Sequence, residues 1–237
     1  MEIKTIASGS RGNCYHLTDG ETPLLLEAGI SIKRIKRGVN FKLSQVKGAL
    51  ITHEHGDHAK AKSVLNLVKM GINCYMSKGT RSKLSIPDEY SYRIRIVAPK
   101  LSFKIGTWVI LPLDAEHDAE EPLCYLLANK DGEKLLFATD TYYLKYKFKG
   151  LTHLMLECNY ALDTLDENIE NGSVHPALRK RIVRSHFSLG NVKEFLKAND
   201  LSEVQEIHLI HSSSKNGDKK RFMREIEELT GKMVFTH

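Results

Sequence analysis

Short apolar runs recur along the chain, separated by polar stretches. Most are rich in Leu, Ile and Val, a pattern typical of buried strands. The predicted strands cover residues 3–6, 24–26, 49–52, 108–113, 124–128, 135–138, 154–156 and 207–210. Asp19-Gly20, between two of the early runs, predicts a hairpin turn. The first third of the chain is therefore expected to contain antiparallel pairs.

Amphipathic stretches with a helical period lie between the later runs. The predicted helices cover residues 59–70, 176–183, 192–198 and 219–229. Strands followed by helices favour α/β layers, and the early hairpin favours mixed rather than purely parallel sheets. No repeat, low-complexity tract or Pro/Gly/Ser-rich linker interrupts the pattern. One compact domain over residues 1–237 is the simplest expectation.

Composition narrows the class of protein. Hydrophobic residues make up 41 % and charged residues 27 % of the chain, which argues against disorder. No apolar run approaches the roughly 18 residues of a membrane span, and the N-terminus has no signal-peptide pattern. Four widely spaced cysteines form no Cys-x-x-Cys pair and are expected to be reduced, buried thiols. These features predict a cytoplasmic protein with no membrane partner.

The strongest chemical signal follows the strand predicted at residues 49–52. His53, His55, Asp57 and His58 are four potential metal ligands within six residues, and Gly56 allows a tight loop among them. Imidazole and carboxylate donors together suit zinc, manganese or iron better than calcium or magnesium. A solvated polar loop is the alternative, but such a concentration of histidines in a chain with only 11 favours a metal site.

This segment resembles the metallo-β-lactamase superfamily, whose signature is His-x-His-x-Asp-His after an apolar strand. The later segments that contain His117, Asp140 and His211, and Glu27 after an early strand, match its remaining motifs in order. The resemblance covers nearly the whole chain. It implies a four-layer αββα sandwich with the metal site at one edge of the two central sheets.

The resemblance also implies two divalent metal ions, with zinc or manganese favoured. His53, His55 and His117 would hold the first, Asp57, His58 and His211 the second, and Asp140 would bridge both. Taken singly, each of His117, Asp140 and His211 is more often a surface or core residue. However, all three end apolar runs and so emerge at a sheet edge. Glu27, where the superfamily usually has Asp, would support the histidine loop from behind the ligands.

Further segments resemble the bacterial YycJ/WalJ-type nucleases, which are metal-dependent DNA phosphodiesterases. They include Ser8 to Cys14, Glu27-Ala28-Gly29, Glu157-Cys158-Asn159 and Ser185 to Ser188. The implied mechanism is attack on phosphorus by a hydroxide that bridges the two metals. Asp57 would also orient this nucleophile, and His186 would contact the phosphate or protonate the leaving oxygen. An equally good interpretation is that His186 merely packs before a helix capped by Ser188.

A formal net charge of +6 permits a polyanionic partner. Candidate substrate-binding residues are Arg179 and Arg181, Lys145 and Lys147 in a tract that alternates with aromatic residues, and Asn159. Solvated helix faces, an ordinary strand edge and a turn would also explain these groups.

The leading hypothesis is a DNA nuclease. Two alternatives remain open: hydrolysis of a small cyclic nucleotide phosphodiester, lactone or thioester, and a non-catalytic nucleic-acid-binding domain. All the expected metal ligands are present, which argues against a non-catalytic binding domain.

Overall fold

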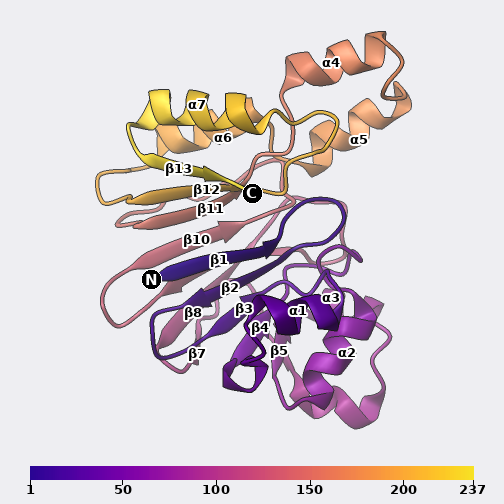
Figure 1. Ribbon diagram of the computed structural model, residues 1–237, viewed down its shortest axis with the longest axis vertical. Helices are drawn as coiled ribbons and strands as arrows, with labels where there is room; N and C mark the ends of the chain where they lie inside the picture. Colours follow the sequence, from indigo (N-terminus) through magenta and orange to yellow (C-terminus); the bar gives the residue numbers. More distant parts are fainter. The chain divides into compact units, whose positions relative to one another are not determined.

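The computed structural model describes residues 1–237, which divide into two compact units (Figure 1). The N-terminal unit consists of Met1–Asp114 and Ala119–Gly132, and the C-terminal unit of Ala115–Asp118 and Glu133–His237. Each unit combines a sheet with helices, so the chain is an α/β protein. A single domain over residues 1–237 stays a prediction.

The N-terminal unit contains a six-stranded mixed sheet and an antiparallel group of three strands. The sheet has the order β1-β2-β3-β4-β5-β6, formed by Glu2–Ala7, Cys14–Thr18, Leu24–Leu26, Gly48–Leu50, Cys74–Met76 and Ile94–Ile96. Its first three strands are antiparallel neighbours, and β3 to β6 run parallel. The group of three consists of β7 (Phe103–Ile105), β8 (Trp108–Asp114) and β9 (Leu123–Ala128). The predicted hairpin at Asp19-Gly20 joins β2 to β3.

Three helices cover this mixed sheet: α1 (Ile32–Gly38), α2 (Ala61–Lys69) and α3 (Lys78–Lys83). Short 3₁₀ turns occupy Leu43–Gln45 and Asp88–Arg93. Helix α2 buries Val64, Leu67 and Val68, a spacing that places them on one helix face. They pack in one core with residues of β3, β4 and β5, and Figure 1 shows α1, α2 and α3 beside these strands. This packing holds the loop that leaves β4.

The C-terminal unit is built on four parallel strands. They are β10 (Lys134–Ala138), β11 (His153–Glu157), β12 (Glu206–Ile210) and β13 (Met233–Thr236). All five residues of β11 are buried, as expected for a strand covered on both faces. Ala138 aligns with Leu156, and Leu156 with Leu209, so the carboxyl ends of β10, β11 and β12 meet at one edge. Ligands commonly bind at such an edge.

Four helices complete this unit: α4 (Leu162–Glu170), α5 (Ala177–Ser185), α6 (Leu189–Ala198) and α7 (Lys219–Thr230). Figure 1 shows α6 and α7 over the sheet, and α4 and α5 as a pair projecting from it. Tyr160, Leu165 and Val174 form a small core of their own under this pair, with apolar residues of α5 packed against it. The side chain of Ser188 accepts a hydrogen bond from Asn191 N, which confirms the predicted cap of α6.

The predicted strands and helices are confirmed with shifts of a few residues. Helix α2 begins at Ala61 rather than near Ala59, because Ala59 instead forms a parallel bridge with Ala28. All four cysteines are buried and unbridged, as predicted. Every helix is too short or too polar to serve as a membrane span.

Candidate metal centre

The histidine loop leaves β4 and places two imidazoles edge to edge. His53, only 1 % exposed, has its Nδ1 2.9 Å from the hydroxyl of Thr52, and its Nε2 lies 3.1 Å from Nδ1 of His55. Two nitrogens bound tetrahedrally to one zinc ion, each at about 2.0–2.1 Å, are separated by about 3.4 Å. The spacing of His53 and His55 therefore suits two ligands of one ion.

His58 lies deeper in the same loop and is fully buried. Its Nε2 is 3.2 Å from the side-chain amide of Asn13 and 3.4 Å from a carboxylate oxygen of Asp57. Its Nδ1 is 3.9 Å from Oε1 of Glu27. The Glu27 carboxylate also accepts from Thr52 N at 3.2 and 3.4 Å. Glu27 thus lies behind the histidine loop, in the position that the sequence analysis expects.

Backbone hydrogen bonds fix the loop on the segment after β3. Asn13 N donates to Asp57 O at 2.7 Å, and Ala28 N donates to His58 O at 2.8 Å. Gly29 faces the Asp57–His58 peptide so closely that a Cβ there would lie 1.7 Å from Asp57 O. Only glycine allows this approach, so Gly29 helps to set the position of Asp57 and His58.

A second cluster forms at the carboxyl-end edge of the C-terminal unit. Asp140 follows β10, Glu157 ends β11 and His211 follows β12. His186 joins them from the end of α5. Each of the four offers a nitrogen or oxygen atom within 4.8 Å of the others. Two carboxylates and two imidazoles converge here because three neighbouring parallel strands end side by side.

Glu157 is the centre of this cluster and is fully buried. Its Oε1 lies 2.7 Å from Nδ1 of His186 and 3.1 Å from Nδ1 of His211, and its Oε2 accepts from Phe187 N at 3.0 Å. Burial raises the pKa of Glu157, but His186 and hydrogen bonds to the two histidines outweigh this, so the pKa lies below its usual value. Glu157 is therefore held as a carboxylate that orients both rings.

The same contacts act on His186. Burial lowers its pKa, yet the neighbouring carboxylates of Glu157 and Asp140 more than compensate, so its pKa is raised. The His186 side chain remains 23 % exposed, unlike the buried His211. The sequence allows two interpretations of His186, a catalytic group or a ring that merely packs before α6. A ring that merely packs would explain neither the contact with Glu157 nor the exposure of the side chain. A role for His186 in catalysis stays a prediction.

His117 is oriented by a main-chain acceptor. Its Nδ1 lies 2.8 Å from the carbonyl oxygen of Ser185, which can only accept, so Nδ1 carries the hydrogen. Nε2 is then the basic nitrogen, and it lies 3.5 Å from Oδ2 of Asp140 and 3.4 Å from Oδ1 of Asp118. Burial lowers the pKa of His117 despite the opposing effects of Asp140 and Glu157, which favours a neutral imidazole. This is the arrangement usual for a histidine that binds a metal.

Backbone strain marks the same positions. Among the non-glycine residues with positive φ are Glu27 at 67°, Asp140 at 48° and His211 at 52°. Such conformations cost of order 1–3 kcal/mol and persist where the surroundings impose them, often at functional sites. Around His211, Asn159 provides part of that support, because its amide donates to His211 O at 2.9 Å. Asn159 thus positions a predicted ligand, whereas its predicted substrate contact stays a prediction.

Glu157 and Asn13 lie in segments that resemble the nuclease motifs, but their sequence context alone indicates no role for either residue. Glu157 directly follows an apolar run, the same setting that singled out His117, Asp140 and His211, so this signal could have found it. Asn13 contacts a partner 45 residues away, and no local pattern indicates that.

The predicted substrate-binding residues fall in different surroundings. Arg181 lines an open pocket of about 510 Å³ together with His117, Lys180 and Arg184, and its Nε lies 3.1 Å from Asp118. Arg179 instead forms an ion pair with Asp166 on α4, at 2.7 Å, and is not among the residues that line this pocket. Lys145 and Lys147 line a separate pocket.

The donor chemistry fits a divalent metal. Each unit gathers imidazole nitrogens and carboxylate oxygens, largely buried and fixed by hydrogen bonds from behind. Mixed nitrogen and oxygen donors of this kind suit zinc and other transition metals, whereas calcium and magnesium prefer oxygen alone. The residues predicted to bind metal are His53, His55, Asp57 and His58 in one unit, and His117, Asp140 and His211 in the other.

Comparison with known proteins agrees with this chemistry. Residues 24–211, more than half of the chain, match the family described as the beta-lactamase superfamily domain. The exodeoxyribonuclease YycJ of Bacillus anthracis is 27 % identical over 234 residues, covering 93 % of this chain and 85 % of the relative. The exodeoxyribonuclease WalJ of Streptococcus pneumoniae is 29 % identical over 235 residues, covering 93 % and 84 %.

Among solved structures, the metallo-β-lactamase fold protein YhfI from Bacillus subtilis matches with a TM-score of 0.72 and 13 % identity, covering 99 % of this chain and 95 % of that one. This likeness confirms the predicted fold class, the metallo-β-lactamase fold. The predicted enzyme class, a metal-dependent hydrolase, is likewise confirmed. The chain belongs to the beta-lactamase superfamily.

Proposed function

We propose that this protein is a metal-dependent DNA nuclease. The observation that carries the proposal is the open pocket of the C-terminal unit, in which the predicted ligand His117 shares one space with three cationic side chains of α5. Lys180, Arg181 and Arg184 are all exposed, and cations beside a hydrolytic site suit a substrate with several phosphates. The names of the two nuclease relatives support the same substrate class.

The proposed ligand set follows the family resemblance. His53, His55 and His117 would hold one divalent ion, Asp57, His58 and His211 would hold a second, and Asp140 would serve both. When bound, these ions would activate water and neutralise charge on the phosphate. Zinc and manganese are the candidates that this donor set favours.

The protein groups have separate tasks in this proposal. Asp57 orients the attacking water. His186, whose pKa is raised by its carboxylate neighbours, holds a proton on the imidazole and delivers it to the departing oxygen. Glu157 keeps His186 in place by accepting from its Nδ1, so the proton that is transferred leaves from Nε2. The cations of α5 neutralise phosphates on either side of the one that is cleaved.

Incubation of the metal-loaded protein with linear single- and double-stranded DNA tests the proposal. We expect shortened or nicked products that disappear in the His55→Ala variant. Lys180→Ala should raise KM for DNA and reduce the slope of log KM against log salt concentration by about 0.7–0.9, the effect of one lost phosphate contact. It should leave hydrolysis of a small phosphodiester unchanged. Arg224→Ala, an exposed change on α7, serves as the matched control.

A different outcome would contradict the nuclease proposal. Intact DNA under all metal conditions, with a protein that still hydrolyses the small phosphodiester, would indicate a small-molecule hydrolase. Protein that binds DNA but hydrolyses neither substrate would indicate a binding domain.

A further inference from the structure

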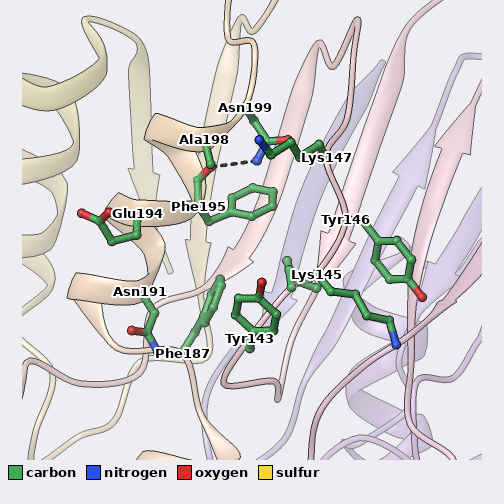
Figure 2. A pocket seen from close by; sticks show the side chains of 11 residues that line it. Tyr143, Lys145, Tyr146, Lys147, Phe187, Asn191, Glu194, Phe195, Ala198 and Asn199 are labelled. Carbon is green, nitrogen blue, oxygen red and sulfur yellow. Dashed lines mark hydrogen bonds between the residues drawn. The ribbon is translucent and has the colours of Figure 1, made fainter.

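A second pocket of the C-terminal unit, with a volume of about 370 Å³, includes four aromatic residues in its lining: Tyr143, Tyr146, Phe187 and Phe195. It lies between the segment that follows Asp140 and one side of α6, from Asn191 to Asn199. Figure 2 shows the rings of Tyr143, Phe187 and Phe195 turned toward the same space, while Lys145 and Tyr146 extend away from them. The volume falls within the range of small-molecule pockets, about 300–1,000 Å³.

The rings differ in exposure. Phe187 and Phe195 are 1 % and 6 % exposed, and their centroids are 6.4 Å apart. Phe148 packs against Phe195 from behind, with centroids 6.2 Å apart. Tyr143, by contrast, is 57 % exposed. The pocket therefore has a buried apolar floor and one exposed aromatic ring at its rim, a geometry suited to a flat aromatic ligand.

Both walls are tied directly to the cluster of Asp140, Glu157, His186 and His211. His186 has an extended backbone, with φ −135° and ψ 150°, so its side chain and that of Phe187 point to opposite sides. His186 points to the cluster and Phe187 into the pocket. On the other wall, Tyr143 follows Asp140 by three residues and accepts a hydrogen bond from Thr141 Oγ1 at 2.8 Å. The chain from His186 to Phe187 thus joins the cluster to this pocket, and Phe187 N also donates to Oε2 of Glu157 at 3.0 Å.

Charge near the pocket suits a phosphate attached to that ligand. Lys147 is exposed and, with Lys145, belongs to the lining. Lys145 lies over the Tyr146 ring at 5.5 Å and 3.9 Å from Glu116. On the opposite wall Glu194 is already engaged by Lys197, at 3.0 Å. An anionic backbone therefore meets lysines along the Tyr143–Lys147 segment.

The polar groups of the lining are mostly occupied. Asn199 accepts from Phe148 N at 2.7 Å and donates to Phe195 O at 2.7 Å, so it braces the wall. The amide of Asn191 donates to Tyr142 O at 2.9 Å. Few groups remain to read the edge of a base, and recognition by stacking tolerates any base.

We propose that this pocket receives one nucleobase of the DNA strand and binds it by stacking without sequence preference. This inference rests on the proposed function. Tyr143 covers the base at the rim, Phe187 and Phe195 form the floor, and Lys147 contacts the adjoining phosphate.

The test uses metal-loaded protein and a single-stranded oligonucleotide with phosphorothioate linkages that resist hydrolysis, so that binding is measured apart from cleavage. An abasic residue is placed at each position in turn. We expect one position at which loss of the base weakens binding roughly ten-fold, the effect of one lost base–aromatic stack. Tyr143→Ala should weaken binding of the intact strand by a similar factor and have little further effect on that abasic strand.

Two variants serve as controls. Tyr143→Phe keeps the ring and should bind like the wild type, and Tyr92→Ala removes another largely exposed tyrosine, in the N-terminal unit. Equal affinity of Tyr143→Ala and wild type, or additive losses from Tyr143→Ala and the abasic residue, would overturn the pocket proposal even if unmodified DNA is still cleaved. A wild-type protein that neither binds nor cleaves DNA would instead overturn the proposed function, and the pocket proposal with it.

Discussion

Gly29 and Gly56 both lie in the motifs around the histidine loop, but the structure predicts very different outcomes for their replacement by alanine. At Gly29 the added Cβ would lie 1.7 Å from Asp57 O, 2.2 Å from Asp57 C and 2.8 Å from His58 N. At Gly56, within the loop itself, the added Cβ would meet no heavy atom within 4 Å, and Gly56 is not among the glycines with positive φ.

The cost at Gly29 follows from the contacts that hold the loop. Ordinary contact begins near 3.4 Å, so the Cβ and Asp57 O must separate by a further 1.7 Å. Such a shift breaks the hydrogen bonds from Asn13 N to Asp57 O and from Ala28 N to His58 O. Each buried group left unpaired costs about 1–3 kcal/mol. We therefore expect Gly29→Ala to lower the free energy of unfolding by roughly 2–5 kcal/mol.

The assay measures the free energy of unfolding in urea and the metal content of each variant after gentle purification. Gly29→Ala should be less stable and should lose metal, because Asp57 and His58 move with the loop. Gly56→Ala should unfold with a free energy within about 0.5 kcal/mol of the wild-type value and should keep the normal metal content. Equal stability and equal metal content of the two variants would refute the argument that Gly29 positions the loop.

Three further predictions concern other parts of the site and the C-terminal unit. Glu157→Gln removes the charge that orients His186, so activity or metal affinity should fall about 10- to 100-fold; a variant with wild-type kinetics and metal content would contradict this role. Chelation should lower the melting temperature, because a metal that binds the folded protein stabilises it by mass action, and added metal should restore it; an unchanged melting temperature would argue against a bound ion. Burial and the neighbouring His208 lower the pKa of His237 from 6.5 to about 4. Protonation thus opposes folding, and stability should decline as the pH falls from about 6.5 toward 4; a His237→Gln variant should decline less, as urea unfolding at several pH values would reveal.

The positions of the histidine loop and of the candidate ligands at the ends of later strands could be predicted because the signals are local. The apolar strand before His53 and the run before His211 each indicate where a side chain emerges at a sheet edge. The parallel order of β10, β11 and β12 then explains why residues as distant as Asp140 and His211 meet. The family resemblance supplied the roles, which local pattern alone could not.

Short elements escaped the sequence reasoning for a physical reason. Strands β5 and β6 have three residues each and contain a Tyr or an Arg, so neither shows the continuous Leu run that indicates the equally short β3. Helix α1 buries only Ile35, so its basic residues obscured its helical period. Elements that depend on tertiary contacts carry little signal in their own residues.

The supporting contacts of the site were equally hidden. Asn13 contacts the ring of His58, and Gly29 leaves room for the Asp57–His58 peptide. Both act on residues far along the chain. The sequence drew attention to Gly56 instead, because it lies inside the histidine motif. The positive φ values of Glu27 and Asp140 also arise from their surroundings, since neither residue type favours this conformation as glycine does.

The most direct test of the central claim is the product pattern from end-labelled linear DNA incubated with protein of known metal content. The account predicts labelled fragments that shorten with time, require zinc or manganese, and are absent in the Asp140→Asn variant. DNA that stays intact with metal-loaded wild-type protein, or that is degraded equally by Asp140→Asn, would contradict it.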